Sequence, residues 1–338
     1  MIKLENRIKA FATVGKILKE LSDEEKEHIY LSAKNENSWF TDENISLALE
    51  GVQRYLEEDK LRQWTQSLPE QPSSVKKVGV VMAGNIPLVG FHDFLTVLIS
   101  GHQLLAKLSS QDSFLIKYIS GILTDIEPRF KEKILFLDKL KEAEAMIATG
   151  SNNTARYFEY YFAKIPHIIR QNRTSIAVLN GEESQEELKE LGNDVFQYFG
   201  LGCRNVSKIY VPDHYDFKDV LDSWQAFSPI SFHHKYNNNY DYNKSILLVN
   251  NEPHYDTGFV LLRETPQLVS PISVIFYERY TDNEDLKKKL DTMEDKIQCV
   301  VSQQAWYPNS FAFGEAQQPE LWHYADGVNT LDFLQNLS

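Results

Sequence analysis

The sequence predicts an α/β protein with two domains, in which helical crossovers join the strands of parallel sheets. Two observations lead to this fold class. From residue 78 onward, short apolar runs alternate with longer stretches whose apolar residues recur at helical spacing. The chain has 338 residues, enough for two packed domains, and its 42% hydrophobic and 25% charged residues give the balance of a globular protein.

The first half of the chain is predicted to begin with helices and to continue with alternating strands and helices. Residues 1–65 show helical apolar spacing, whereas 67–74 contains two prolines and three serines and is predicted to be a loop. Short apolar runs predict strands at 78–83, 103–109, 133–138, 145–150 and 175–180. Helical stretches are predicted between them at 87–100, 113–126 and 153–165.

A second alternating set is predicted in the rest of the chain. Its strands are expected at 208–212, 259–264, 271–280 and 296–302, and its helices at 183–199 and 283–295. The Asn- and Tyr-rich segment 235–245 is predicted from its composition to be a surface loop. The first domain is expected to cover residues 1–180 and the second 181–310, with a tail at 311–338 that folds back across the boundary.

Charge and cysteine content narrow the class of protein. A net charge of -13, from 35 basic and 48 acidic residues, argues against a nucleic-acid partner, because neutralising phosphates requires a basic face. No run approaches the roughly 20 apolar residues that span a membrane, and the N-terminus lacks the features of a signal peptide. Two cysteines give neither a disulfide framework nor a metal-binding pair, so we expect a cytoplasmic, reducing setting.

Asn85 is the first candidate for chemistry. It lies in the segment GNIP, which follows an apolar strand and is predicted to open a helix with Pro87 in its first turn. This places Asn85 at the carboxyl end of a strand, where open α/β sheets bind ligands. Its amide could donate a hydrogen bond to an oxyanion. The alternative is that Asn85 only caps the following helix.

The two thiols have different surroundings. Cys203 ends the segment GLGC, and its flanking glycines permit an accessible turn in which backbone N–H groups lower the thiol pKa or bind an oxyanion. The alternative for Cys203 is a small buried residue. Cys299 lies within the apolar strand IQCVVS and is predicted to belong to the core.

Two further segments are candidates for binding a phosphate or a ribose. Lys107 lies near the end of an apolar strand, where it either binds a ribose or phosphate group or is simply solvated. Gly150 and Ser151 are predicted to form a strand-to-helix turn whose N–H groups face an anion. A GxGxxG fingerprint and a GxSxG nucleophile elbow are both absent, and the adjacent His233 and His234 do not have metal-ligand spacing.

These segments occur in an order that resembles the aldehyde-dehydrogenase superfamily. GNIPL resembles the region that carries its oxyanion-hole asparagine, LAKLSSQDS its lysine-bearing cofactor strand, ATGSNNT its Thr-Gly-Ser turn, GLGC its nucleophile turn and SPISVIFYERY its Gly-Pro-Val segment. The segments GNIPLVGFHDFLTVLISGH and AQQPELWHYADGVNTLDFL are still more similar to the LuxC-like acyl-CoA reductase family. The resemblance spans residues 78–335.

The resemblance implies an aldehyde-dehydrogenase-like fold and the NADPH-dependent reduction of a fatty acyl thioester, carried by CoA or a carrier protein, to an aldehyde. The domain at 1–180 would bind the dinucleotide and the domain at 181–310 would be catalytic. The resemblance also implies a homo-oligomer, a dimer or a tetramer. The implied catalytic residues are Cys203 and Asn85, and the implied cofactor-binding residues are Lys107, Ser109, Ser110, Gly150 and Ser151.

The sequence departs from the aldehyde-dehydrogenase pattern in three places. HIIRQNRTS stands where the general-base glutamate is expected and holds no carboxylate, which suits a reductase whose acyl-enzyme must resist water. Ser110 replaces a glutamate that would repel a 2′-phosphate, so NADPH is permitted, and Gln267 replaces a ribose-binding glutamate. The alternatives are an aldehyde dehydrogenase that works in the oxidative direction and a non-catalytic member of the same fold.

Overall fold

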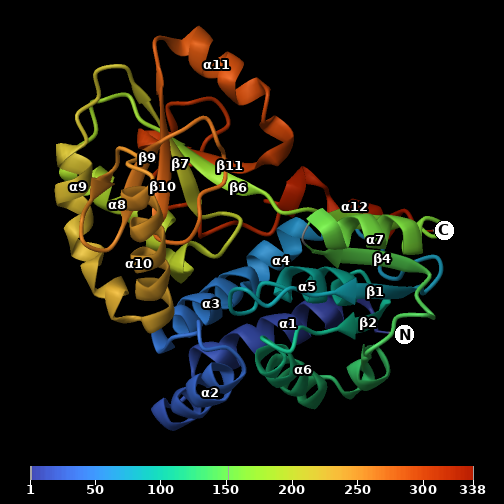
Figure 1. Ribbon diagram of the computed structural model, residues 1–338. Helices are drawn as coiled ribbons and strands as arrows, with labels where there is room; N and C mark the ends of the chain where they lie inside the picture. The colour runs from blue at the N-terminus through green and yellow to red at the C-terminus, as the bar shows by residue number, and fades with distance from the viewer. Residues whose placement is uncertain (1, 151, 338) are drawn as a thin grey trace. The chain divides into compact units, whose positions relative to one another are not determined.

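The computed structural model describes residues 2–150 and 152–337, and the chain divides into two compact units (Figure 1). Unit 1 comprises Met1–Asn172 and Glu320–Ser338, and unit 2 comprises Arg173–Pro319. No helix in the described part of the chain is both long and apolar enough to cross a membrane.

Unit 1 begins with four helices, as the apolar spacing predicts. Their bounds are α1 (Leu4–Lys19), α2 (Asp23–Glu36), α3 (Asp42–Tyr55) and α4 (Glu58–Trp64). The hydroxyl of Ser22 accepts from the N–H of Glu25, whose carboxylate accepts from Ser22 N–H, so a capping box starts α2. The predicted loop at 67–74 is confirmed, since it contains neither helix nor strand.

A five-stranded parallel sheet forms the core of unit 1. Its order is β3-β2-β1-β4-β5, with β1 (Lys77–Val81), β2 (Gln103–Lys107), β3 (Ile134–Phe136), β4 (Ala145–Thr149) and β5 (His167–Arg170). The helices that alternate with these strands are α5 (Phe91–Ile99), α6 (Phe114–Ile126) and α7 (Asn152–Phe162). Because the chain moves outward from β1 first on one side and later on the other, the strand order reverses between β1 and β4. Ligands of open α/β sheets bind at such a switch point.

The segment between β1 and α5 differs from the prediction. The helix expected at 87–100 begins only at Phe91, and Gly90 is its N-cap. Leu88 has a φ of 59°, a left-handed conformation that interrupts helical geometry. A Cβ at Gly90 would come within 2.8 Å of the side chain of Met82, so glycine is required for this turn to pack over the end of β1. Pro87 therefore lies in a turn that precedes the helix.

The C-terminal segment returns to unit 1 and packs against it. The Trp64 indole donates to the Tyr324 hydroxyl at 2.7 Å, and His92 Nε2 lies 2.9 Å from the Leu321 carbonyl oxygen. The final helix, α12 (Thr330–Gln335), packs against α5. Thus residues 320–337 complete the packing of a unit that the first half of the chain begins.

Unit 2 contains a six-stranded sheet in the order β11-β6-β7-β10-β9-β8. Its strands are β6 (Thr174–Val178), β7 (Val206–Pro212), β8 (Tyr255–Asp256), β9 (Leu261–Glu264), β10 (Val274–Tyr280) and β11 (Ile297–Ser302). All neighbouring pairs are parallel except β8 with β9. The predicted boundary at 180/181 and the structural boundary at 172/173 differ because β6 pairs with β7 and β11.

Both faces of the unit 2 sheet are covered by helices. On one face, α8 (Gln185–Phe196) and α9 (Lys218–Trp224) pack against residues such as Ala177 and Ile209. On the other, α10 (His234–Val249) and α11 (Asn283–Asp291) cover a separate set of side chains that includes Tyr210 and Phe276. Strands buried on both faces read as continuous apolar runs, which explains why they could be predicted.

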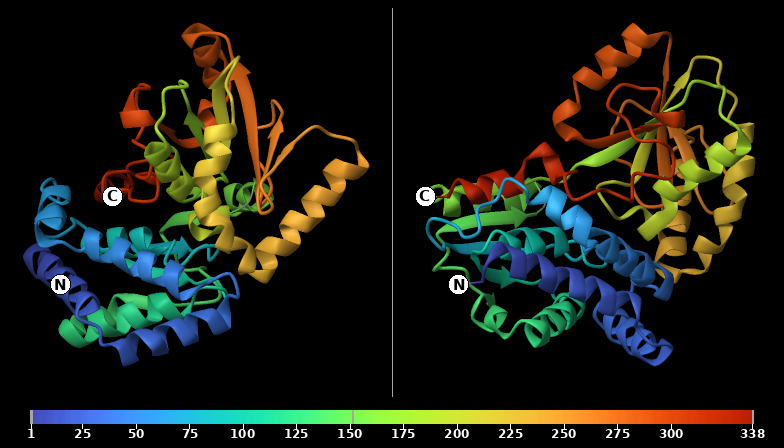
Figure 2. Two further views of the ribbon diagram at one scale, coloured as in Figure 1. Left: turned by 90° about the vertical axis from the view of Figure 1, so that its left-hand side faces the viewer. Right: turned by 180° about the vertical axis from the view of Figure 1, so that it is seen from behind.

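The predicted surface loop at 235–245 is wrong, because these residues lie within α10, a long helix of unit 2 (Figure 2). Tyr236, Tyr240 and Leu247 recur at helical spacing and are buried. The Tyr240 hydroxyl also donates to Asp256 at 2.6 Å, which ties the helix to β8. Burial of this tyrosine-bearing face therefore outweighs the low helix propensity of the asparagines.

Candidate active site

The carboxyl edge of the unit 1 sheet gathers most of the predicted site residues. Asn85 follows β1, Lys107 ends β2, Ser109 and Ser110 follow it, and Gly150 follows β4. Since β1 lies between β2 and β4, these positions share the edge that includes the switch point. Ser151 lies outside the described residues. Cys203 belongs to unit 2.

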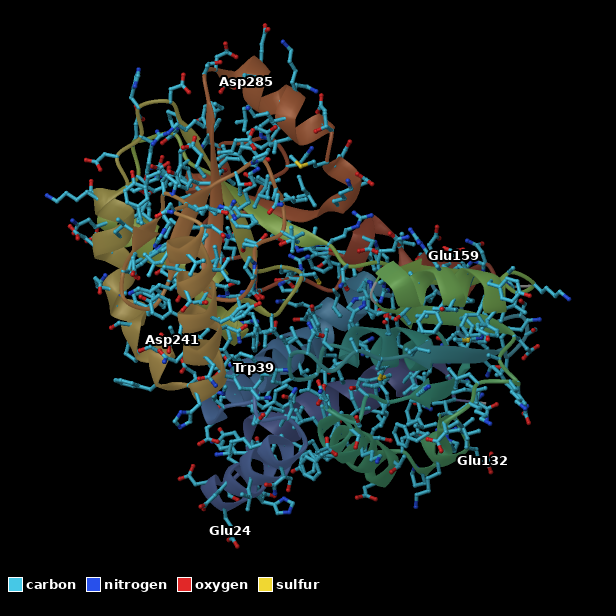
Figure 3. The ribbon with its side chains drawn as sticks, viewed as in Figure 1. Glu24, Trp39, Glu132, Glu159, Asp241 and Asp285 are labelled. Carbon is cyan, nitrogen blue, oxygen red and sulfur yellow. The ribbon has the colours of Figure 1, made fainter. Side chains whose placement is uncertain are left out.

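The loop that carries Asn85 is anchored by the connection between α2 and α3. Asn37, which is buried, donates through Nδ2 to the carbonyl oxygen of Gly84 at 3.0 Å. Its Oδ1 accepts from the backbone N–H of Trp39, labelled in Figure 3, at 3.0 Å. Asn85 itself is exposed. Because Gly90 is the N-cap of α5, the alternative role of Asn85 as its cap is wrong.

Gly84 and Ser109 pack closely where the loops after β1 and β2 meet. A Cβ at Gly84 would come within 2.5 Å of Ser109 Oγ, so only glycine fits this contact. Ser109 Oγ also accepts from the N–H of Gln111 at 3.2 Å. Ser110 and Lys107 are exposed, and no carboxylate among the described residues forms an ion pair with Lys107. Their hydroxyl and ammonium groups therefore face solvent at this edge.

Asp112 holds the turn after Asn85 in place. Its Oδ2 accepts from the N–H of Leu88 at 2.7 Å, whereas Oδ1 is buried and has no hydrogen-bond partner. Burial raises the pKa of Asp112 to about 7, and the nearby Glu36 carboxylate adds to this increase. Glu36 in turn accepts from the N–H groups of Ser113 and Phe114, so it caps the start of α6.

Replacing Asp112 with Asn is expected to reduce the pH dependence of folding stability. The folded pKa lies above the ordinary value of 3.8, so the stability present below about pH 4 is lost progressively as the pH rises towards 7. The loss amounts to on the order of 2–4 kcal/mol. Asn keeps an oxygen for Leu88 N–H and carries no charge. Urea unfolding of Asp112→Asn at several pH values should show a flatter profile than wild type.

The matched control is Asp125→Asn, which changes an exposed carboxyl of α6. Its stability profile should parallel that of the wild type. Parallel profiles for Asp112→Asn and the wild type would show that Asp112 has an ordinary pKa in the folded protein.

Cys203 lies in a tight turn at the amino end of β7. Its side chain is exposed, as the glycine-flanked segment predicts. The chain leaves α8 through three consecutive left-handed residues, Tyr198, Phe199 and Gly200, before it reaches this turn. A non-glycine residue in this conformation is uncommon, and two in succession require support from their surroundings.

Asn205 connects this turn to the end of α8. Its Nδ2 donates to the carbonyl oxygens of Gln197 at 2.8 Å and Asp194 at 3.1 Å. Its Oδ1 accepts from the N–H of Gly202 at 2.8 Å, and its backbone N–H donates to the Gly202 carbonyl at 3.0 Å. Asn205 is 2% exposed. It therefore supplies partners for carbonyls that a helix end leaves without intrahelical hydrogen bonds.

Ser175, at the start of β6, holds the other side of the turn. Its Oγ donates to the carbonyl oxygen of Cys203 at 3.0 Å and lies 3.0 Å from Cys299 Sγ. Cys299 is buried, as predicted, and burial raises the pKa of its thiol. A thiol in this state is a poor nucleophile. Of the two thiols, Cys203 is the one that solvent reaches.

Arg204, the residue after Cys203, is hydrogen-bonded to the segment that follows β11. Arg204 donates to the carbonyl oxygen of Ala316 at 3.2 Å and lies over the Phe311 ring. The N–H of Ala316 donates to Asp194 at 3.0 Å. Burial raises the pKa of Asp194 to about 7. Ala316 therefore links Arg204, which its carbonyl oxygen accepts from, to Asp194 of α8, to which its N–H donates.

The segment HIIRQNRTS contributes β5, which the sequence analysis missed. At its end Arg170 is buried and forms an ion pair with Asp93 of α5 at 2.6 Å. Arg170 also donates to the hydroxyl of Thr330 at 2.9 Å. Gln267 is exposed in the connection after β9. The carboxylate next to the end of β5 is that of Asp93, and it is ion-paired with Arg170.

Sequence analysis did not identify four residues that shape the site: Asn37, Asp112, Ser175 and Asn205. The sequence signal for Asn205 is its position two residues after Cys203, in the same turn. The other three lie far along the chain from the segments they hold. Over residues 2–150 and 152–337, no group of three or more His, Cys, Asp or Glu side chains could hold a metal ion.

Comparison with known proteins identifies the fold. No family model matches the sequence, and no curated protein matches it. An aldehyde dehydrogenase from Bacillus cereus in complex with NAD+ is similar in structure, with a TM-score of 0.64 and 13% identity over 89% of this chain and 72% of that chain. An oxidoreductase from Marinobacter aquaeolei gives a TM-score of 0.65 and 12% identity over 89% and 74% of the two chains.

A betaine aldehyde dehydrogenase from Staphylococcus aureus, a double mutant in complex with NAD+, is similar over a larger part of this chain. Its TM-score is 0.64 with 13% identity, and the match covers 94% of this chain and 74% of that chain. At such low identity these likenesses concern the fold. The chain has the aldehyde-dehydrogenase-like α/β fold, with parallel sheets and helical crossovers, as the sequence predicts.

Proposed function

We propose that this chain, which has the aldehyde-dehydrogenase fold, reduces a fatty acyl thioester to an aldehyde with NADPH through an acyl-enzyme on Cys203. The observation that carries the proposal is the exposed Cys203 in a turn whose flanking peptide groups are hydrogen-bonded to Ser175 and Asn205. An accessible thiol on a fixed backbone is what a covalent mechanism requires.

In the first step, the Cys203 thiolate attacks the carbonyl carbon of the thioester. The bond between the acyl carbon and the sulfur of CoA or a carrier protein breaks, and the departing thiolate takes up a proton. The Asn85 amide and the Cys203 N–H stabilise the negative charge that develops on the carbonyl oxygen. With NADPH bound, its hydride would convert the acyl-enzyme to a thiohemiacetal on Cys203, and collapse of that group would release the aldehyde and return the thiolate.

The carboxyl edge of the unit 1 sheet fits a nicotinamide dinucleotide. Lys107 and Ser110 present an exposed ammonium and hydroxyl, which suit ribose or phosphate oxygens. Gly150 lies between β4 and the N-terminus of α7, where backbone N–H groups favour an anion. When bound, NADPH supplies the hydride. We assign unit 1 to cofactor binding and unit 2, which carries Cys203, to catalysis.

Two observations favour this reaction over its alternatives. The carboxylate of Asp93, which α5 brings to the end of β5, is ion-paired with Arg170, which leaves it unsuited to activating water against the acyl-enzyme. This supports a reductase over an oxidative aldehyde dehydrogenase. The exposure of Cys203 supports an enzyme over a non-catalytic member of the fold.

The proposal is tested by incubating the protein with acyl-CoA thioesters of different chain length and NADPH. We expect NADPH absorbance to fall as aldehyde accumulates and free CoA appears in equal amount. Aldehyde oxidation with NAD+ or NADP+ and no reduction of acyl-CoA would identify the oxidative alternative. Absence of both reactions, together with absence of acylation at Cys203, would leave the non-catalytic alternative.

Replacing Lys107 with Ala is expected to raise the KM for NADPH about 10–100-fold. Loss of a hydrogen bond to a charged group costs about 1.5–3 kcal/mol. Acylation of Cys203 precedes use of the cofactor, so its single-turnover rate should stay nearly unchanged. Steady-state kinetics and rapid-quench acylation measure the two quantities. Lys141→Ala, which removes an exposed lysine elsewhere in unit 1, is the control. If acylation falls as much as NADPH affinity, Lys107 does not serve the cofactor.

A further inference from the structure

The orientation of the peptide group between Gly202 and Cys203 follows from the hydrogen bonds of Asn205. The Gly202 carbonyl oxygen accepts from the buried Asn205 backbone N–H at 3.0 Å. The described chain contains no cis peptide bond. In a trans peptide group the C=O and N–H bonds point in opposite directions. The N–H of Cys203 therefore points away from the Asn205 backbone.

The neighbouring peptide groups are also fixed. The Gly202 N–H is committed to Asn205 Oδ1 at 2.8 Å, and the Cys203 carbonyl is committed to Ser175 Oγ at 3.0 Å. The Asn205 carbonyl accepts from Ser175 N–H at 3.2 Å, so the two residues are bonded to each other as well. Three consecutive peptide groups around the thiol thus have partners in Ser175 or Asn205.

The Asn205 side chain anchors this arrangement to a rigid element. Its Nδ2 donates to the carbonyls of Asp194 and Gln197 at the end of α8, and the residue is almost completely buried. The preceding chain is left-handed at Tyr198, Phe199 and Gly200, a path that needs such support. The amide of Asn205 is the group that joins the helix end to the Gly202 N–H.

We infer that Asn205 is a positioning residue for acyl transfer: by bonding both the end of α8 and Gly202, it aims the Cys203 N–H at the oxyanion that forms during attack by the thiol. The inference rests on the proposed function, because it assumes an acyl group on Cys203. Asn205 acts through the backbone and touches no reacting atom.

The first test compares two reactions of the same thiol in Asn205→Ala. Acylation by decanoyl-CoA needs an oxyanion donor, whereas alkylation by iodoacetamide needs only the thiolate. We expect single-turnover acylation to slow about 10–100-fold, since a misplacement of 1 Å costs about 10²-fold. Alkylation of Cys203 should change less than about threefold, and the affinity for NADPH should stay the same. Mass spectrometry of the Cys203 peptide measures both modifications.

A second variant and a control separate positioning from general stability. Ser175→Ala removes only the donor to the Cys203 carbonyl and the contact with Cys299, and it should slow acylation less than Asn205→Ala. Asn193→Ala removes an amide on the same helix that donates to Glu190, and it should leave acylation unchanged. Amide hydrogen exchange at residues 202–205 should be faster in Asn205→Ala than in the wild type. If Asn205→Ala does not fold, Ser175→Ala still tests the inference.

The outcomes distinguish the inference from the proposed function. Wild-type protein that is alkylated at Cys203 but never acylated overturns the proposed function and the positioning role with it. Acylated wild type with normal acylation in a folded Asn205→Ala overturns the positioning role alone. Equal losses of acylation and alkylation also overturn the positioning role, because Asn205 would then affect the thiol itself. Unchanged hydrogen exchange at Gly202 overturns it too, because the turn would then not depend on Asn205.

Discussion

Replacing Cys203 with Ala should abolish covalent acylation and lower acyl-CoA reduction by about 10³-fold or more, because the reaction then has no nucleophile. Labelled acyl-CoA followed by peptide mass spectrometry measures the label, and NADPH oxidation measures turnover. The exposed position of Cys203 predicts little change in thermal stability.

The control for this experiment is Cys299→Ser. Cys299 is buried beside Ser175, and a hydroxyl at this position can keep a hydrogen bond to Ser175 Oγ. This variant should retain acylation at Cys203. Label retained in Cys203→Ala, or lost in a folded Cys299→Ser, would show that the nucleophile has been assigned to the wrong thiol.

Replacing Asn85 with Ala should slow acyl transfer by about 10²–10³, the effect of removing one oxyanion donor. Asn85 is exposed and Gly90 is the N-cap of α5, so loss of helix capping does not compete as an explanation. The melting temperature should therefore change little. Single-turnover acylation measured beside thermal unfolding gives both quantities.

Two comparisons sharpen the test of Asn85. Asn238→Ala removes an exposed asparagine of α10 and should leave both quantities unchanged. Asn37→Ala removes the donor to the Gly84 carbonyl and should lower stability as well as acylation, because the loop loses its buried anchor. A normal acylation rate in folded Asn85→Ala would exclude Asn85 from the reaction.

The sequence was most informative about strands buried on both faces. The run at 175–180 was found because residues 175–179 are all apolar or small, and the part of it that forms β6 is buried throughout. The strand β5 was missed because it ends in Arg170, a buried charged residue whose partners Asp93 and Thr330 lie far away in the sequence. A long-range ion pair leaves no local pattern.

Those features of the candidate site that depend on neighbouring residues in the sequence could be predicted. Glycines flanking Cys203 indicated an exposed turn, and an apolar neighbourhood indicated a buried Cys299. The function of Asn205 could not be seen in the same way, because its partners are carbonyls at a helix end whose position the sequence does not give. Asp112 was missed for a related reason, since it bonds a residue 24 positions away.

The return of residues 320–337 to unit 1 sets an order on folding during synthesis. Unit 2 occupies the middle of the chain and is therefore synthesised in full before the last segment of unit 1 is made. Until then Trp64, His92 and Arg170 lack partners in Tyr324, Leu321 and Thr330. Unit 1 is therefore finished last although it is begun first, and a nascent chain stalled near residue 319 would expose apolar surface of α5 to chaperones.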